Sequence, residues 1–158
     1  MRFKHVSLCG LVLAAGWLPA MAPAGEVANY SPVTQQRLTK PEPGNWLLYR
    51  RTYDGHGYSP LDKINASNVK NLVPVWSFQT GVVDGLEATP LIVDGVIYLS
   101  TAWNHVFAID ARNGAELWHY KRRLPQKLSF CCGPTNRGVS IVNRTDLVAR
   151  TRPGYYAQ

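Results

Sequence analysis

Two turn dipeptides, Asp94-Gly95 and Asn113-Gly114, constrain the fold of this chain because each separates short apolar segments. Both dipeptides adopt positive φ at low cost, as a tight hairpin requires. The flanking segments are rich in β-branched and aromatic residues, which predicts strands over residues 89–93, 96–100, 105–110 and 116–120. An earlier segment, 73–79, predicts one more strand. An antiparallel meander is the expected arrangement.

Helical periodicity is weak elsewhere. The polar stretch that begins at Val33 can form a short helix, which Pro41, Pro43 and Gly44 would end. The predicted fold class is therefore all-β. Regularly spaced short strands fit a β-propeller blade and a β-sandwich, and periodicity alone does not choose between the two.

Residues 1–24 have the pattern of a secretory signal peptide. Arg2 and Lys4 precede the apolar stretch VSLCGLVLAAGWL, and small residues follow it at a candidate cleavage site. This stretch is shorter than the roughly 20 residues that span a bilayer. We therefore expect an exported chain that has no membrane span after the signal is cleaved.

The surplus of basic residues is modest, with a formal net charge of +7. Much of it lies in the run YKRRLPQK, which carries no acidic residue. We interpret this run as a solvated loop, because an exported chain does not meet chromosomal nucleic acid. The sequence predicts no nucleic-acid partner, while an anionic partner stays open.

Cys131 and Cys132 are adjacent, and they are the cysteines that remain once Cys9 leaves with the signal peptide. Zinc thiolates are usually spaced about two to four residues apart, so a zinc site is disfavoured. A disulfide between neighbours is possible but strained, because Cα atoms across a trans peptide lie about 3.8 Å apart. No CxxCH motif occurs, which excludes covalent c-type haem on this chain.

The segment AIDARNGAELW, residues 108–118, resembles the tryptophan-docking motif of quinoprotein β-propellers. The motif positions fall on Ala108, Asp110, Gly114 and Trp118. The glycine makes the tight turn, and the tryptophan packs between neighbouring blades with an indole N–H that needs an acceptor. The expected role of Trp118 is structural.

Five segments occur in the order found in alcohol dehydrogenases of the methanol/ethanol family that depend on pyrroloquinoline quinone (PQQ). They lie between about residues 42 and 140 and read EPGNWLLYRRTYDGHGYSPL, INASNVKNLVPVWSF, GLEATPLIVDGVIYLST, VFAIDARNGAELWHY and CCGPTNRGV. The resemblance implies a periplasmic, eight-bladed β-propeller. Its central site would hold PQQ beside a calcium or lanthanide ion.

The resemblance also assigns cofactor contacts to Glu87, Cys131, Cys132 and Arg137. It implies that the two cysteines form a vicinal disulfide against one face of the quinone, and that Arg137 binds the carboxylates of the cofactor. Glu87 would hydrogen-bond a polar edge of the quinone or pair with Arg137. The plainer interpretations are reduced buried thiols, a surface carboxylate and a solvated arginine.

No catalytic residue and no metal ligand is expected in this chain, because the resemblance places the family's metal ligands and catalytic aspartate in later blades. His56, His105 and His119 show no ligand spacing and no partner cysteine or carboxylate, so we expect them to be structural or exposed.

After Ile141 the blade pattern stops. We interpret 25–141 as the N-terminal part of the propeller and 142–158 as an atypical tail from a truncated or frameshifted gene, which genomic reads across those codons would test.

The predicted function is that of an N-terminal fragment of a periplasmic PQQ-dependent alcohol dehydrogenase. The complete enzyme would oxidise a small primary alcohol by hydride transfer to the quinone and pass electrons to a cytochrome c, while the fragment alone would be inactive. Two alternatives stay open. One is a quinoprotein sugar dehydrogenase, against which the cysteine pair argues, and the other is a non-enzymatic propeller scaffold that binds partner proteins.

Overall fold

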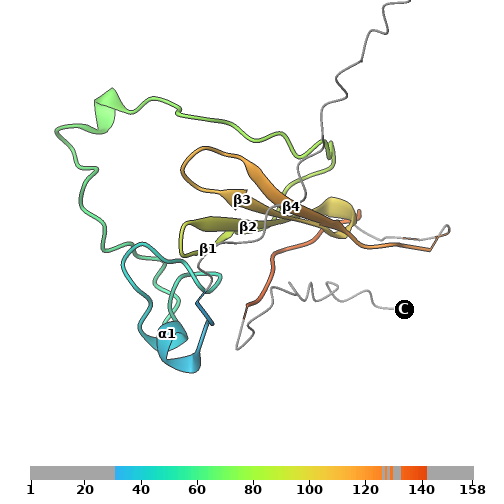
Figure 1. Cartoon of the computed structure of the whole chain (residues 1–158), viewed down its shortest axis with the longest axis horizontal. Coiled ribbons are helices and arrows are strands. Elements are labelled where there is room, and N and C mark those ends of the chain that lie inside the picture. Colours follow the sequence, from blue (N-terminus) through green and yellow to red (C-terminus); the bar gives the residue numbers. More distant parts are fainter. Residues whose placement is uncertain (1–30, 126, 128, 130–132, 142–158) are drawn as a thin grey trace, which may run out of the picture.

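The structure is a computed structural model that describes residues 31–125, 127, 129 and 133–141. Its centre is one antiparallel sheet in which the strands follow one another in chain order (Figure 1). The strands are β1 (Leu91–Val93), β2 (Val96–Thr101), β3 (His105–Asp110) and β4 (Glu116–Lys121). The predicted meander is confirmed, with strand ends that differ by at most two residues from those expected.

The β1–β2 turn is the two-residue hairpin that the sequence predicts. Asp94 has φ 49° and Gly95 has φ 82°, so both central residues are left-handed. This turn type matches the twist of the flanking strands and fixes their register, with Val93 opposite Val96. The register in turn brings Leu91 opposite Tyr98 in the core.

The β3–β4 connection differs from the expected second two-residue hairpin. It runs from Ala111 to Ala115, and within it only Gly114 has a positive φ, of 74°. Polar side chains widen the turn: the Asp110 carboxylate accepts a hydrogen bond from the Arg112 N–H at 2.9 Å, and the Asn113 Oδ1 accepts one from the Ala115 N–H at 2.9 Å. Local side-chain bonds of this kind favour a longer loop.

The core lies mainly on one face of the sheet. Strand β3 is buried along its whole length, whereas β4 is largely exposed. The buried cluster joins the strands to α1 (Gln35–Thr39) and to the segment that follows residue 138. Its members are Val33, Leu38, Leu47, Leu91, Val93, Val96, Tyr98, Val106, Ala108, Val139 and Ile141.

Residues 73–79 do not form the strand that their sequence predicts. Val73 and Val75 are exposed, while Trp76 and Phe78 turn toward the sheet. The Phe78 ring meets Phe107 edge-on at 5.4 Å between centroids. A strand needs a hydrogen-bonded neighbour, and this segment is held by side-chain packing instead. Figure 1 shows the chain swinging out from the sheet in a wide arc, which includes η1 (Val69–Asn71), before it reaches β1.

The short helix α1 is confirmed, and Arg37 ties it to the β1–β2 turn. The Thr34 hydroxyl caps the helix by accepting from the Arg37 N–H at 3.3 Å. The Arg37 guanidinium binds Glu42 at 2.8 Å and Asp94 at 2.6 Å. Arg37 is the main cause that lowers the pKa of Glu42 to about 2, and this contact also raises the pKa of Arg37. Helix and hairpin are therefore joined electrostatically.

This ion pair predicts a stability loss in acid. Because the folded-state pKa of Glu42 lies below its ordinary value of 4.5, its contribution is complete above pH 4.5 and is lost as the pH falls toward about 2. We expect the urea midpoint of Glu42→Gln to change less than that of the unaltered chain across this interval. Asp54 and Asp110 also have lowered pKa values and titrate in both proteins, so they serve as an internal control. Equal changes in the two midpoints would contradict the assigned role of Glu42.

Candidate functional site

Glu87 and Arg137 are brought together by the fold although they are distant in the sequence. Glu87 precedes β1, and Arg137 lies on the segment that returns to the sheet after β4. The Arg137 Nε lies 3.5 Å from the Glu87 Oε2, and their side chains are 83% and 47% exposed. Of the two arrangements expected for Glu87, the contact with Arg137 is therefore present. Both charged groups stay accessible to a ligand.

The segment that carries Arg137 is anchored by Asn136, whose exposed fraction is only 2%. The Asn136 Oδ1 accepts from the Ser100 hydroxyl at 2.7 Å and from the Gly138 N–H at 3.0 Å. Its Nδ2 donates to the Asn104 Oδ1 at 2.7 Å. Sequence reasoning missed this network, because Ser100 and Asn104 lie more than thirty residues from Asn136 and asparagine is common in loops.

The β2–β3 connection is η2 (Ala102–Asn104), in which Trp103 and Asn104 have φ values of 62° and 55°. The Trp103 indole N–H donates to the Asp84 carboxylate at 2.7 Å. The Trp103 backbone N–H donates to the Pro134 carbonyl at 2.9 Å. A left-handed tryptophan is unusual, and this conformation was not predictable from the sequence.

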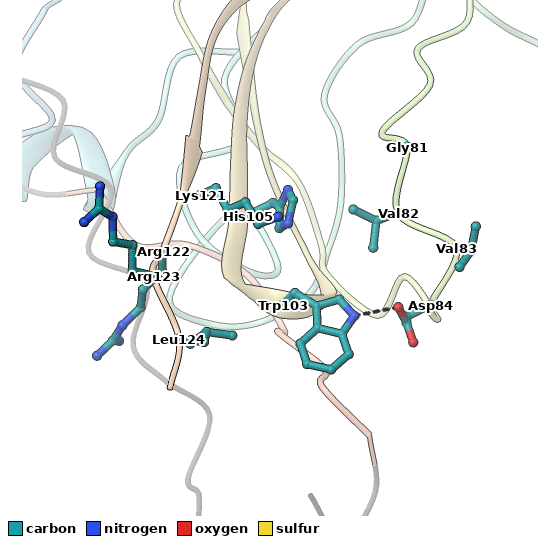
Figure 2. Close-up of a pocket in the computed structure, with 10 residues that line it drawn as sticks. All are labelled: Gly81, Val82, Val83, Asp84, Trp103, His105, Lys121, Arg122, Arg123 and Leu124. Carbon is teal, nitrogen blue, oxygen red and sulfur yellow. Dashed lines mark hydrogen bonds between the residues drawn. The ribbon is translucent and has the colours of Figure 1, made fainter. Parts of the chain in front are cut away.

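An open cavity of about 840 Å³ lies beside this turn. Figure 2 shows the Trp103 indole facing Asp84 on one side, with residues 121–124 on the other. The guanidinium groups of Arg122 and Arg123 point away from Trp103 in this view. Neither Glu87 nor Arg137 lines the cavity, so the cavity does not contain the Glu87–Arg137 pair.

The histidines are in contacts that the sequence did not reveal. His105 Nδ1 lies 2.9 Å from His119 Nε2 across β3 and β4. The His119 ring stacks on Phe107 with 4.1 Å between centroids. Burial lowers the pKa of His105, and the nearby His119 and Lys121 add to this effect.

His56 corrects one expectation, because it does have a carboxylate partner. Its Nδ1 lies 3.2 Å from the Asp54 Oδ2. Both side chains are largely exposed, so this contact does not define a buried site.

The described part of the chain contains no group of three or more histidine, cysteine, aspartate or glutamate side chains that could hold a metal ion. In the same residues, no helix is long and apolar enough to cross a membrane. Cys131, Cys132, the predicted signal peptide and the segment 142–158 lie outside the described residues.

Tryptophan docking is present, and the docked residue on the Asp110–Ala115 turn is Trp76. Its indole covers Gly114 so closely that a Cβ there would lie 2.6 Å from the ring. The indole N–H donates to the Ala111 carbonyl at 3.1 Å. Trp118, the tryptophan of the same motif, is half-buried against the core, with its ring 6.0 Å from that of Tyr98. The motif turn thus receives a tryptophan from the preceding segment.

Comparison with known proteins agrees with this arrangement. The family model described as the PQQ glucose/ethanol/alcohol dehydrogenase β-propeller domain matches residues 46–154. This match continues past Ile141 into the segment whose sequence we predict to be atypical, and that boundary stays a prediction. The match confirms the propeller fold class.

Named relatives point to the same family. The dehydrogenase subunit of the quinone alcohol dehydrogenase of Gluconacetobacter polyoxogenes is 46% identical over 103 residues, which is 64% of this chain and 14% of that protein. The quinohemoprotein alcohol dehydrogenase of Comamonas testosteroni has a TM-score of 0.60 at 40% identity, over 63% of this chain and 15% of that one. A europium-containing methanol dehydrogenase has a TM-score of 0.59 at 37% identity, over 68% and 19%.

The chain therefore spans less than a fifth of the length of these relatives. Within that span, the four-stranded blade, the tryptophan docked on its motif turn and the family match to residues 46–154 agree. The chain belongs to the β-propeller family of PQQ-dependent glucose, ethanol and alcohol dehydrogenases.

Proposed function

We propose that this chain supplies one wall of the quinone site of a PQQ-dependent alcohol dehydrogenase. The observation that carries the proposal is the accessible pair of Glu87 and Arg137, which the fold brings to within 3.5 Å from two separate segments. Exposed charges at such a distance attract each other only weakly in water, so a ligand can displace the contact at little cost. The pair offers one cationic and one anionic group side by side.

The chemistry of this pair fits the cofactor. A planar guanidinium can bind two oxygens of a carboxylate at once, which suits Arg137 to the carboxylates of PQQ. The Glu87 carboxylate can accept a hydrogen bond from a polar edge of the ring system or stay paired with Arg137. These two residues would bind and orient the cofactor.

Cys131 and Cys132 complete the proposed wall. We assign them to a vicinal disulfide that lies against one face of the quinone, on the basis of the family resemblance. A rigid, apolar plate suits stacking on a planar ring, and the strain of such a bridge is a cost found at functional sites. Export of the chain to the periplasm would favour the oxidised pair.

When bound, PQQ supplies the hydride acceptor for oxidation of an alcohol. We propose a calcium or lanthanide ion for the complete enzyme, and the part that we assign to this chain is to bind and orient the quinone. A small primary alcohol as substrate, a cytochrome c as electron acceptor and a periplasmic location are likewise proposals for the complete enzyme. The alcohol dehydrogenases among its relatives support an alcohol as substrate, while the electron acceptor and the location rest on the family resemblance.

A quinone titration tests this proposal. We expect Arg137→Met to weaken PQQ binding at least about tenfold, because a charge-assisted hydrogen bond is lost. Binding can be followed by quenching of tryptophan fluorescence. Arg112→Met is a matched control, since the Arg112 side chain is also 83% exposed and also pairs with a carboxylate, that of Asp110. Equal affinity of the two variants, or no binding by the unaltered chain, would overturn the proposed function.

A further inference from the structure

The β2–β3 turn holds two consecutive non-glycine residues in the left-handed region. Trp103 has φ 62° and Asn104 has φ 55°. Asparagine adopts the left-handed conformation fairly often, but tryptophan adopts it rarely. A left-handed tryptophan persists only where surrounding contacts hold it in place. The contacts of Trp103 and Asn104 therefore indicate which function the strained backbone of the turn supports.

The first of these residues reaches toward the segment that carries Glu87. The Trp103 indole N–H donates to the Asp84 carboxylate at 2.7 Å, just upstream of Glu87. The Trp103 backbone N–H donates to the Pro134 carbonyl at 2.9 Å, just upstream of Arg137. Trp103 thus contacts both chain segments that lead to the charged pair, one before Glu87 and one before Arg137.

The second residue holds the segment that carries Arg137. The Asn104 Oδ1 accepts from the Asn136 Nδ2 at 2.7 Å, and the exposed fractions of the two residues are 3% and 2%. The Asn136 Oδ1 also binds the Ser100 hydroxyl, and Ser100 is 1% exposed. Buried, hydrogen-bonded amides of this kind fix a backbone more firmly than exposed contacts do.

The contact between Glu87 and Arg137 is too weak to set its own geometry. It measures 3.5 Å between exposed side chains. Exposed ion pairs contribute little and are screened by salt. The separation of the two charged groups must therefore come from the backbone that carries them.

We propose that the Trp103-Asn104 turn, acting with Asn136, positions Glu87 and Arg137 for the quinone. This inference rests on the proposed function. The turn links the two segments, because Trp103 contacts residues before both members of the pair and Asn104 fixes the residue next to Arg137. Trp103, Asn104 and Asn136 are positioning residues and do not touch the cofactor.

A double-mutant cycle on the full chain tests whether Asn136 acts through Arg137. We expect Asn136→Leu to weaken PQQ binding about tenfold when Arg137 is present, and to have no further effect in an Arg137→Met background. Equal losses in both backgrounds would indicate a general structural role and overturn the proposal. Unchanged affinity in the presence of Arg137 would overturn it as well.

A second variant covers the case in which Asn136→Leu does not fold. Asn104→Gly keeps the left-handed backbone without strain and removes only the amide that binds Asn136. We expect it to lower PQQ affinity, and Asn104→Asp, which keeps an acceptor oxygen, to restore most of the loss. Asn113→Gly is the matched control, because Asn113 lies in the β3–β4 turn, at the opposite end of the sheet. An equal effect of Asn104→Gly and Asn113→Gly would contradict the proposal.

Hydrogen exchange gives a readout that needs no cofactor. The Gly138 amide is bonded to the Asn136 Oδ1, so we expect Asn104→Gly to speed its exchange about tenfold while Asn113→Gly does not. An unaltered rate would overturn the positioning role even if PQQ binds. If the unaltered chain binds no PQQ, the proposed function fails, and the exchange rates still decide whether the turn holds the Arg137 segment.

Discussion

Gly114→Ala is expected to destabilise the blade by roughly 2–4 kcal/mol, a large part of the stability of a small domain. Two costs combine at this position. Gly114 has φ +74°, where a side chain is strained, and a Cβ would lie 2.6 Å from Trp76 Cε3 and 2.7 Å from Cδ2. The Trp76 ring would have to leave the turn and give up its hydrogen bond to the Ala111 carbonyl.

Gly95→Ala separates the two costs. Gly95 has φ +82°, but a Cβ there would meet no atom within 4 Å. It should therefore cost only about 1–2 kcal/mol, from backbone strain alone. The measurement is the free energy of unfolding in urea for both variants. Equal losses would mean that Trp76 does not pack on the turn in solution.

The second large effect is on catalysis. We expect purified residues 25–158 to reduce an artificial electron acceptor no faster than a blank when given PQQ, calcium or a lanthanide, and a primary alcohol. The chain covers 14% of the quinone alcohol dehydrogenase subunit of Gluconacetobacter polyoxogenes, and misplacing reacting groups by about 1 Å can cost on the order of a hundredfold. The proposed quinone site would have only the wall that this chain supplies, without the residues that close its other side.

The exposed strands of the sheet also lead us to expect no activity from the isolated chain. Strand β4 is largely exposed, and on its side away from β2, strand β1 is bridged in the described residues through Trp46 and Ile92. Such strand edges favour association of isolated chains. A complete quinoprotein alcohol dehydrogenase serves as the positive control. Alcohol-dependent reduction by residues 25–158 that disappears in Arg137→Met would contradict the expectation.

Local signals account for the parts of the fold that were predictable. The Asp94-Gly95 dipeptide specifies its own turn, and its position sets the register of β1 and β2 without help from distant residues. The motif glycine, Gly114, likewise marks the β3–β4 connection. A contact between Glu87 and Arg137 was one of two arrangements that the family resemblance allowed, because it places both residues at one site.

Non-local contacts account for the parts that were not predictable. The apolar alternation at residues 73–79 is typical of a strand, but whether it pairs depends on a neighbour that local sequence does not specify. The docking of Trp76 on Gly114 depends on where a distant segment returns to the sheet. The bond between Asn104 and Asn136 also depends on tertiary structure, because both are ordinary loop residues in sequence.

The most direct test of the central claim is to observe Arg137 itself while PQQ is added. The Nε–H signals of arginine side chains can be followed by nuclear magnetic resonance in the unaltered chain and assigned with Arg137→Met and Arg112→Met. We predict that the Arg137 signal shifts with PQQ in a saturable manner and that the Arg112 signal does not move. Saturable shifts confined to Trp103 and the cavity beside it, with no change at Arg137, would contradict the account.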